Sequence, residues 1–219
     1  MLELAVFLLC LLTSGAATGG LEDKVLLFPQ KTNNSLVAIT PQIPLNFTAF
    51  TLCMRVTTEQ QEQKDVILFA YHTDAYEFYI WIDKDGGTGL YLSGNNDAVH
   101  FSLPPSLFTL RTHLCFTWSS STGFTAAWMN GQRSVYQLYR KGQAIRPGGV
   151  VKLGQYPNME NFVGEITDMN LWDEVLTAKE IKGVYAHTTS VKVAKVIDWF
   201  TVEPEILPGI NVEVINDDV

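Results

Sequence analysis

The sequence has few cysteines, little positive charge and no long apolar run after its N-terminal region, and each shortage excludes a class of protein. The 15 Lys and Arg residues are outnumbered by 23 Asp and Glu residues, which gives a formal net charge of −8. Without a cluster of basic residues, nucleic acid and anionic membranes are poor partners. There is no G-x-S-x-G motif, and the 4 histidines lack metal-ligand spacing, so neither a serine nucleophile nor a histidine-held zinc is predicted.

The N-terminal region has the layout of a secretory signal peptide, although Glu3 replaces the usual basic start. Leu4–Leu12 is uncharged and apolar, and small residues follow it at 14–20. This run is shorter than the roughly 20 apolar residues that span a bilayer. We therefore predict a signal peptide at 1–19, cleaved within about 16–19. The mature chain at 20–219 is predicted to be secreted, extracellular and without a membrane span.

Secretion changes what the 3 cysteines can do. Cys10 leaves with the signal peptide, so Cys53 and Cys115 remain for the oxidising conditions outside the cell. Each lies in a strand-like run, FTLCMRV or HLCFTWSS, where apolar residues alternate with the face that carries the cysteine. We predict a disulfide between them, with two unpaired buried thiols as the alternative.

The distribution of strand patterns favours a single all-β domain at 20–219. With 47% hydrophobic and 11% aromatic residues the chain can bury one sizeable core. Alternating runs such as EFYIWID, AVHFSL and HLCFTWSS follow at short intervals, and Asn130-Gly131 is a strong hairpin signal. One short helix is predicted at Thr177–Tyr185, where Thr177 and Glu180 have capping-box spacing. The predicted fold class is therefore all-β: a two-sheet antiparallel jelly-roll sandwich, concanavalin- or lectin-like, with one short α-helix.

The HLCFTWSS segment also carries a family signature. It matches the pentraxin pattern His-x-Cys-x-Ser/Thr-Trp-x-Ser/Thr at His113, Cys115, Thr117, Trp118 and Ser120. Further matches follow in order along the chain: FTLC ending at Cys53, WMNGQ at 128–132, LGQ at 153–155, FVGEI at 162–166, LWDEVL at 171–176 and IDW at 197–199. The chain resembles the short pentraxins, the C-reactive protein and serum amyloid P class, along essentially its whole mature length.

The resemblance implies a fold, an assembly and a function. It implies a jelly roll with a cross-sheet disulfide between Cys53 and Cys115, and a secreted homo-oligomeric ring, usually a pentamer. Such rings are non-enzymatic pattern-recognition molecules of innate immunity and the acute phase, and each protomer binds Ca²⁺. The ions accept the phosphate of phosphocholine, phosphoethanolamine or related ligands on microbes or damaged cells, and carbohydrate is a further ligand class. Complement or receptor proteins are the other partners that the resemblance brings in.

The calcium loop departs from the family pattern. After LGQ the family continues with Glu-Gln-Asp and a long acidic excursion, whereas Tyr156 and Pro157 occupy the first two ligand positions here and most of the excursion is missing. Asp74, Asn158 and Glu160 are the residues that could still supply side-chain oxygens, for one weak site instead of two. Solvated turn residues are the alternative interpretation of these three.

Other features leave alternatives open. The sequons at Asn33 and Asn46 predict surface glycan, but such tripeptides also occur by chance. Glu165 and Asp168 are separated by an odd number of positions, which places them on opposite faces of a regular strand and argues against a glycosidase carboxylate pair. A laminin-G-like or lectin-like adhesion module, or a pentraxin that binds its ligand without calcium, remains the alternative function.

Overall fold

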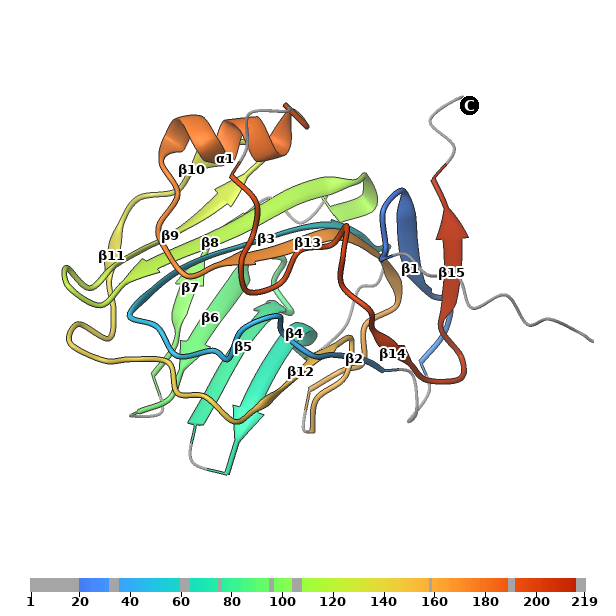
Figure 1. The fold of residues 1–219 in the computed structure, drawn as a ribbon, viewed down its shortest axis with the longest axis horizontal. Coiled ribbons are helices and arrows are strands. Elements are labelled where there is room, and N and C mark those ends of the chain that lie inside the picture. Colours follow the sequence, from blue (N-terminus) through green and yellow to red (C-terminus); the bar gives the residue numbers. More distant parts are fainter. Residues whose placement is uncertain are drawn as a thin grey trace, which may run out of the picture.

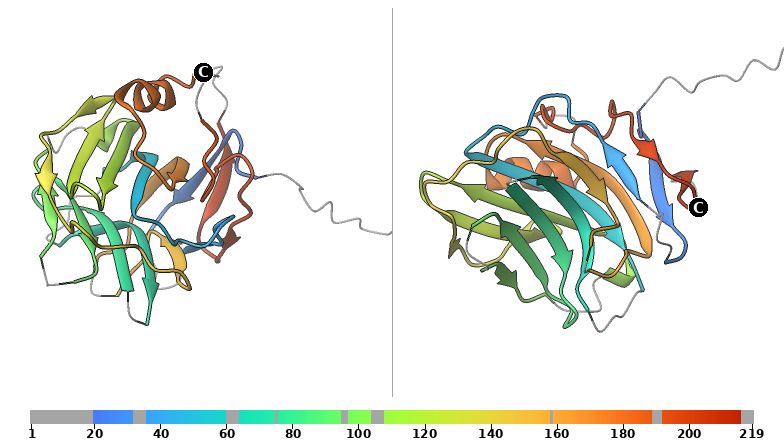
Figure 2. Two further views of the ribbon diagram at one scale, coloured as in Figure 1. Left: turned by 60° about the vertical axis from the view of Figure 1, so that its left-hand side comes forward. Right: turned by 90° about the horizontal axis from the view of Figure 1, so that it is seen from below.

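Two antiparallel β-sheets pack face to face, and one α-helix lies outside the larger sheet (Figure 1, Figure 2). The computed structural model describes residues 20–31, 36–59, 64–74, 76–94, 97–103, 108–157, 159–188 and 192–215. The predicted signal peptide lies outside these residues, as do Asn33 and Asn158.

The larger sheet, called sheet A, has the strand order β10-β9-β8-β3-β13-β1-β15, and β11 also pairs with β9. Its strands are β1 (Lys24–Phe28), β3 (Ala49–Thr57), β8 (Thr112–Ser119), β9 (Phe124–Met129), β10 (Gln132–Arg133), β11 (Gln137–Leu138), β13 (Gly164–Trp172) and β15 (Asn211–Val214). The smaller sheet, sheet B, has the order β14-β2-β12-β4-β5-β6-β7. Its strands are β2 (Val37–Ile39), β4 (Val66–Thr73), β5 (Tyr76–Ile82), β6 (Thr88–Leu92), β7 (Val99–Phe101), β12 (Val150–Leu153) and β14 (Glu205–Ile206).

The main core lies between the two sheets and follows the alternation seen in the sequence. On β8, Leu114, Phe116 and Trp118 are fully buried in this core. Aromatic rings from the two sheets meet there, for example Phe50 of β3 and Phe78 of β5, whose ring centroids are 4.7 Å apart. Each such side chain stabilises the fold by about 1.5–3 kcal/mol through the apolar area it removes from water. The all-β sandwich prediction is confirmed.

The second face of sheet A is buried as well, because helix α1 (Ala178–Tyr185) covers it. Thr177 and Glu180 form the predicted capping box, and Ile181 is the buried residue of the helix. Ile181 belongs to a second apolar cluster with Cys53, Cys115, Trp128, Trp172, Leu176 and Ala194. Within the described residues no helix is long and apolar enough to cross a bilayer.

The predicted hairpin and disulfide are both present. Asn130 and Gly131 adopt φ values of 48° and 75° between β9 and β10, as the tight turn requires. Cys53 and Cys115 lie directly opposite each other on β3 and β8 and are bonded, with an S–S distance of 2.05 Å. The pairing is confirmed, but the expectation of a cross-sheet bridge was wrong. Both cysteines belong to sheet A, on the face toward the helix.

The two ends of sheet A are both apolar and exposed. At one end, Val135 and Leu138 are 78% and 74% exposed beside β9 and β11. At the other end, Val212 and Val214 on β15 are 41% and 63% exposed. Figure 1 shows β10 and β11 on the left of the molecule and β15 on the right. The chain therefore carries two separated apolar edges on one sheet.

Candidate ligand-binding site

The outer face of sheet B carries one continuous cross-strand row of side chains. Lys152 of β12 is paired with Ala38 of β2 on one side and with Ala70 of β4 on the other. Ala70 is paired with Tyr79 of β5, and Tyr79 is paired with Tyr91 of β6. Because paired residues in antiparallel strands project to the same face, these side chains form a row that runs from a cation to two aromatic rings.

The aromatic end of this row is a small cluster outside the main core. Tyr79 and Tyr91 are stacked with ring centroids 5.7 Å apart, and Tyr79, Trp81, Ile67 and Ala70 are buried together. The indole ring of Trp81 lies over Gly89 of β6. A side chain at position 89 would overlap with this ring. The apolar patch is closed from outside by Tyr156 and Met159, which pack against it from the loop at 154–163.

Tyr156 anchors that loop to the face of sheet B. Its ring centroid is 4.3 Å from that of Tyr79, the Tyr79 hydroxyl donates to the Tyr156 hydroxyl, and this hydroxyl donates to Glu77 Oε1 at 3.2 Å. Burial raises the pKa of both tyrosines, so both stay protonated donors at neutral pH. Thus Tyr156, which the resemblance places at the first calcium-ligand position, holds the loop against sheet B.

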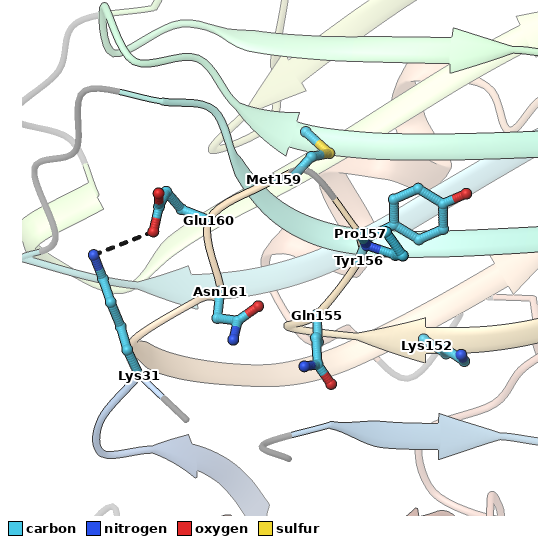
Figure 3. Close-up of a pocket in the computed structure, with 8 residues that line it drawn as sticks. All are labelled: Lys31, Lys152, Gln155, Tyr156, Pro157, Met159, Glu160 and Asn161. Atoms are coloured by element: carbon cyan, nitrogen blue, oxygen red, sulfur yellow. Dashed lines mark hydrogen bonds and ion pairs between the residues drawn. The ribbon is translucent and has the colours of Figure 1, made fainter. Parts of the chain in front are cut away.

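A cavity of about 500 Å³ opens beside the anchored loop, as Figure 3 shows. The residues that shape it and can form polar contacts are Lys31, Lys152, Gln155, Tyr156, Glu160 and Asn161. Lys152 lines its edge from β12, whereas Gln155 and Asn161 come from the two ends of the loop and project to the same side. This cavity and the aromatic row together form the candidate site.

The predicted calcium ligands are arranged as follows. Asp74 is exposed in the turn between β4 and β5, and Asn158 lies outside the described residues. Glu160 lines the cavity, but its two carboxylate oxygens face Lys31 Nζ at 3.4 Å and Lys64 Nζ at 3.5 Å. Two lysines around one carboxylate, and a tyrosine at the first ligand position, do not fit the family's two-ion calcium site.

The backbone of Glu160 is held as firmly as its side chain. Its N–H donates to the carbonyl of Asp65 at 2.9 Å, and its carbonyl accepts from the N–H of Ile67 at 3.2 Å.

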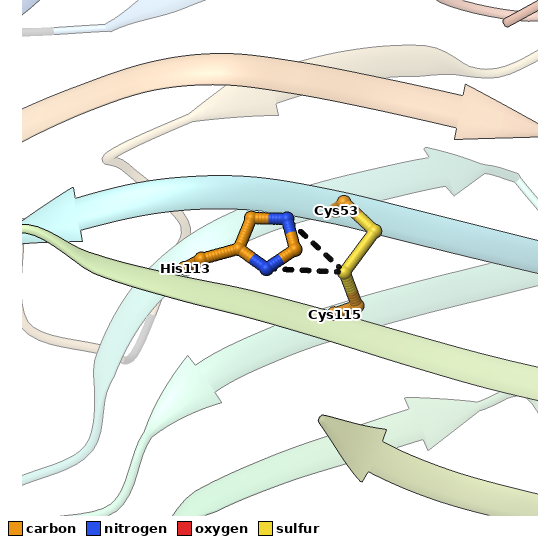
Figure 4. A group of neighbouring side chains, drawn as sticks. All are labelled: Cys53, His113 and Cys115. Atoms are coloured by element: carbon orange, nitrogen blue, oxygen red, sulfur yellow. Dashed lines mark hydrogen bonds between the residues drawn. A yellow bond between two sulfur atoms is a disulfide. The ribbon is translucent and has the colours of Figure 1, made fainter. Parts of the chain in front are cut away.

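Among the described residues, one group of three His, Cys, Asp or Glu side chains has its possible ligand atoms close together: Cys53, His113 and Cys115. In this group the two sulfurs are bonded to each other (Figure 4).

His113 has the structural role that its place in the signature predicts. It is 1% exposed, its Nε2 lies 3.5 Å from Cys115 Sγ, and its ring centroid is 5.7 Å from that of Tyr185. Burial, with smaller contributions from Arg55 and His187, lowers the pKa of His113 to about 3. The imidazole is therefore neutral at physiological pH and packs as part of the cluster beneath α1.

The low pKa of His113 predicts a loss of stability in acid. In the unfolded chain this histidine binds a proton near its ordinary pKa of about 6.5, whereas the folded chain resists protonation until about pH 3. As the pH falls through this window, the group lowers the free energy of unfolding by about 1.4 kcal/mol per pH unit. Urea unfolding of wild type and His113→Gln across the window measures the difference in slope. Equal slopes in wild type and His113→Gln would contradict the prediction.

The carboxylates considered for catalysis belong to a bulged strand. The register of β13 shifts between Thr167 and Asn170, and Asp168 has a φ of 54°. The bulge turns Asp168 toward the helix side of sheet A, the same side as Glu165, so the expectation of opposite faces was wrong. Asp168 accepts a hydrogen bond from Arg55 Nε at 2.8 Å, and a carboxylate held in this way serves the packing of α1.

Of the two predicted glycan positions, Asn46 is exposed.

The aromatic and cationic residues of sheet B were not identified from the sequence. The alternation of buried Val151 and Leu153 around Lys152 is a signal that Lys152 faces outward. No sequence pattern, however, places Lys152 beside Ala70 or Tyr79, because β12 follows β4 and β5 by a long stretch of chain.

The fold and this face define a lectin-like jelly-roll binding protein. The model of the Pentaxin family matches residues 24–213. The chain therefore belongs to this family, the pentraxins. It is 46% identical to a C-reactive protein from Danio rerio over 221 residues, which cover 95% of this chain and 98% of the relative. It is 31% identical to a serum amyloid P-component from Mesocricetus auratus, over 80% of this chain and 77% of the relative.

A solved structure supports the fold independently. The heptameric SAP-like pentraxin from Limulus polyphemus superposes with a TM-score of 0.70 at 21% identity, covering 89% of this chain and 96% of that one. Pentraxins such as C-reactive protein and serum amyloid P-component are recognition proteins without enzymatic activity. The prediction that this chain is not an enzyme is confirmed on that basis.

Proposed function

We propose that this protein is a secreted, oligomeric pattern-recognition protein of innate immunity that binds ligands on microbes or damaged cells. The observation that carries the proposal is the similarity to a C-reactive protein along 95% of the chain, within an intact pentraxin fold. The ligand classes are phosphocholine-type and phosphoethanolamine-type head groups and carbohydrate. The outer face of sheet B is the proposed contact surface, because its cavity is lined by the partly exposed ring of Tyr156, which can pack against a choline or sugar.

The oligomer is proposed to be a ring built through the two apolar edges of sheet A. The first edge, called the β11 edge, consists of Phe124, Val135, Tyr136 and Leu138. The second, the β15 edge, consists of Val212 and Val214. Two different surfaces at opposite ends of one subunit form a heterologous contact, which closes into a ring when the rotation allows it. Exposed apolar strand edges of this kind are otherwise an aggregation hazard.

Calcium binding is proposed at one site of low affinity, with Asp74, Asn158 and Glu160 as its side-chain ligands. The affinity is expected in the millimolar range, the weak end for extracellular calcium modules, because Glu160 must leave Lys31 and Lys64 to bind the ion. The Asp74→Ala and Glu160→Ala variants are expected to lose the heat of calcium binding in calorimetry. The Asp85→Ala variant, at a carboxylate that is 82% exposed, is the matched control and should keep it.

The same proteins test the function when they are passed over surfaces that carry dense phosphocholine, phosphoethanolamine or carbohydrate. Binding to at least one surface and not to an undecorated one is expected, with calcium and with a chelator as separate conditions. Absence of binding to every surface in both conditions would overturn the recognition proposal. A monomer in sedimentation that still binds carbohydrate would favour the adhesion-module alternative instead.

A further inference from the structure

We propose that the acidic group of the ligand is bound directly by the side chain of Lys152, in the cavity beside the anchored loop, without a bridging metal ion. The acidic group is the phosphate of a monoester or the carboxylate of an acidic sugar. The inference rests on the proposed function, since it concerns how the same face of sheet B recognises its ligand.

The surroundings of Lys152 leave its ammonium group available on a rigid strand. Val151 and Leu153 are buried in the main core, which fixes the backbone of β12 and turns Lys152 outward. The neighbours of Lys152 in the cross-strand row are Ala38 and Ala70, whose side chains are single methyl groups. Within the described part of the chain Lys152 makes no ion pair, so no carboxylate has to be displaced before it binds an anion.

The charge around the cavity favours an anion in an otherwise acidic protein. Lys31 and Lys152 line the cavity, and Glu160 is the one acidic residue among the described lining residues. The carboxylate of Glu160 already faces Lys31 and Lys64. Two further carboxylates lie near the lining, Glu77 at the Tyr156 hydroxyl and Glu205 beside Ala38 in the cross-strand row, so the cation that favours an anion is Lys152 itself, the lining lysine that makes no ion pair within the described residues.

The other groups in the cavity suit the rest of such a ligand. Gln155 and Asn161 project their amides to the same side of the loop, where they can donate to phosphate or sugar oxygens (Figure 3). The ring of Tyr156 is an apolar wall that can pack against a sugar ring or a trimethylammonium group.

The test measures binding of inorganic phosphate, glucuronic acid and glucose to the full mature protein in a chelator, by calorimetry or ligand-observed NMR. Phosphate or glucuronic acid should bind and neutral glucose should bind more weakly, and the acid that binds tighter identifies the source of the acidic group. Lys152→Met, which keeps the length of the side chain, should weaken that acid about tenfold, the loss expected for one charged hydrogen bond. Lys152→Arg should restore most of the affinity. Lys84→Met, at a lysine that pairs with Asp85, is the matched control and should change nothing.

Several outcomes separate this inference from the proposed function. If neither acid binds in chelator, or if Lys152→Met binds as tightly as wild type while its melting temperature is unchanged, direct recognition by Lys152 is wrong. If binding instead needs calcium and is lost in Asp74→Ala, the inference fails and the recognition function stands. If the assembled protein binds no decorated surface under any condition, the proposed function itself fails.

Discussion

Replacing both Cys53 and Cys115 with alanine is expected to lower the free energy of unfolding by about 4 kcal/mol. The two residues are 62 positions apart, and cross-linking a loop of this length restricts the unfolded chain by about that amount in the entropic model. The sulfurs also fill the centre of the cluster beneath α1, where both cysteines are fully buried. This loss is a large fraction of the net stability of a single domain, which is usually about 5–15 kcal/mol.

Urea unfolding of the double variant and wild type at one protein concentration measures this loss. A fixed concentration is needed because an oligomer gains apparent stability by mass action. The Thr177→Ala variant removes the capping side chain of α1 and serves as the comparison, with an expected loss of about 1 kcal/mol. A loss below about 1 kcal/mol in the cysteine variant would show that the disulfide adds little to folding.

Introducing a charge at the β11 edge is expected to break the proposed ring into monomers. Leu138 is 74% exposed on β11 and pairs with Phe124 of β9. A contact with the next subunit would bury it, so that Leu138→Asp places an unpaired carboxylate in an apolar interface. Because Leu138 lies at the surface of the subunit, the fold itself should be unaffected, and sedimentation velocity separates the two states. Leu110→Asp is the control, since Leu110 is equally exposed, at 76%, in the turn before β8.

A heterologous contact makes a second, sharper prediction from the same variant. Val214→Asp at the β15 edge should also give monomers. A mixture of the two variants should then form heterodimers of one copy each, because each variant retains the edge that the other has lost. Mixed monomers without heterodimers, or an intact ring in Leu138→Asp, would contradict the proposed interface.

The sequence predicts well those structural features that depend on residues close together in the chain. Leu114, Phe116 and Trp118 face the core as their alternation requires. Asn130-Gly131 turns a hairpin because both residues accept positive φ, and Thr177 caps the helix because its hydroxyl reaches the backbone of Glu180. Each of these features depends on residues within a few positions of one another.

The features that depend on distant partners were wrong or were missed. Asp168 faces the helix because a bulge interrupts β13, and an added residue in a strand leaves no mark in the alternation that sequence reasoning uses. The placement of the disulfide within one sheet, and the row from Lys152 to Tyr91, depend on strand order, which the short-range pattern does not encode.

The two apolar edges at opposite ends of sheet A have a consequence for how strongly the assembly can hold a surface. A rotation axis never turns a subunit over, so all copies in a closed ring present the outer face of sheet B in the same direction. Once one cavity has engaged a decorated membrane or cell wall, its neighbours face the same layer at high local concentration. Avidity of this kind can exceed the affinity of a single site by about 10²–10⁴. A weak contact in each subunit can thus give an assembly that stays on dense arrays of ligand and releases single free molecules.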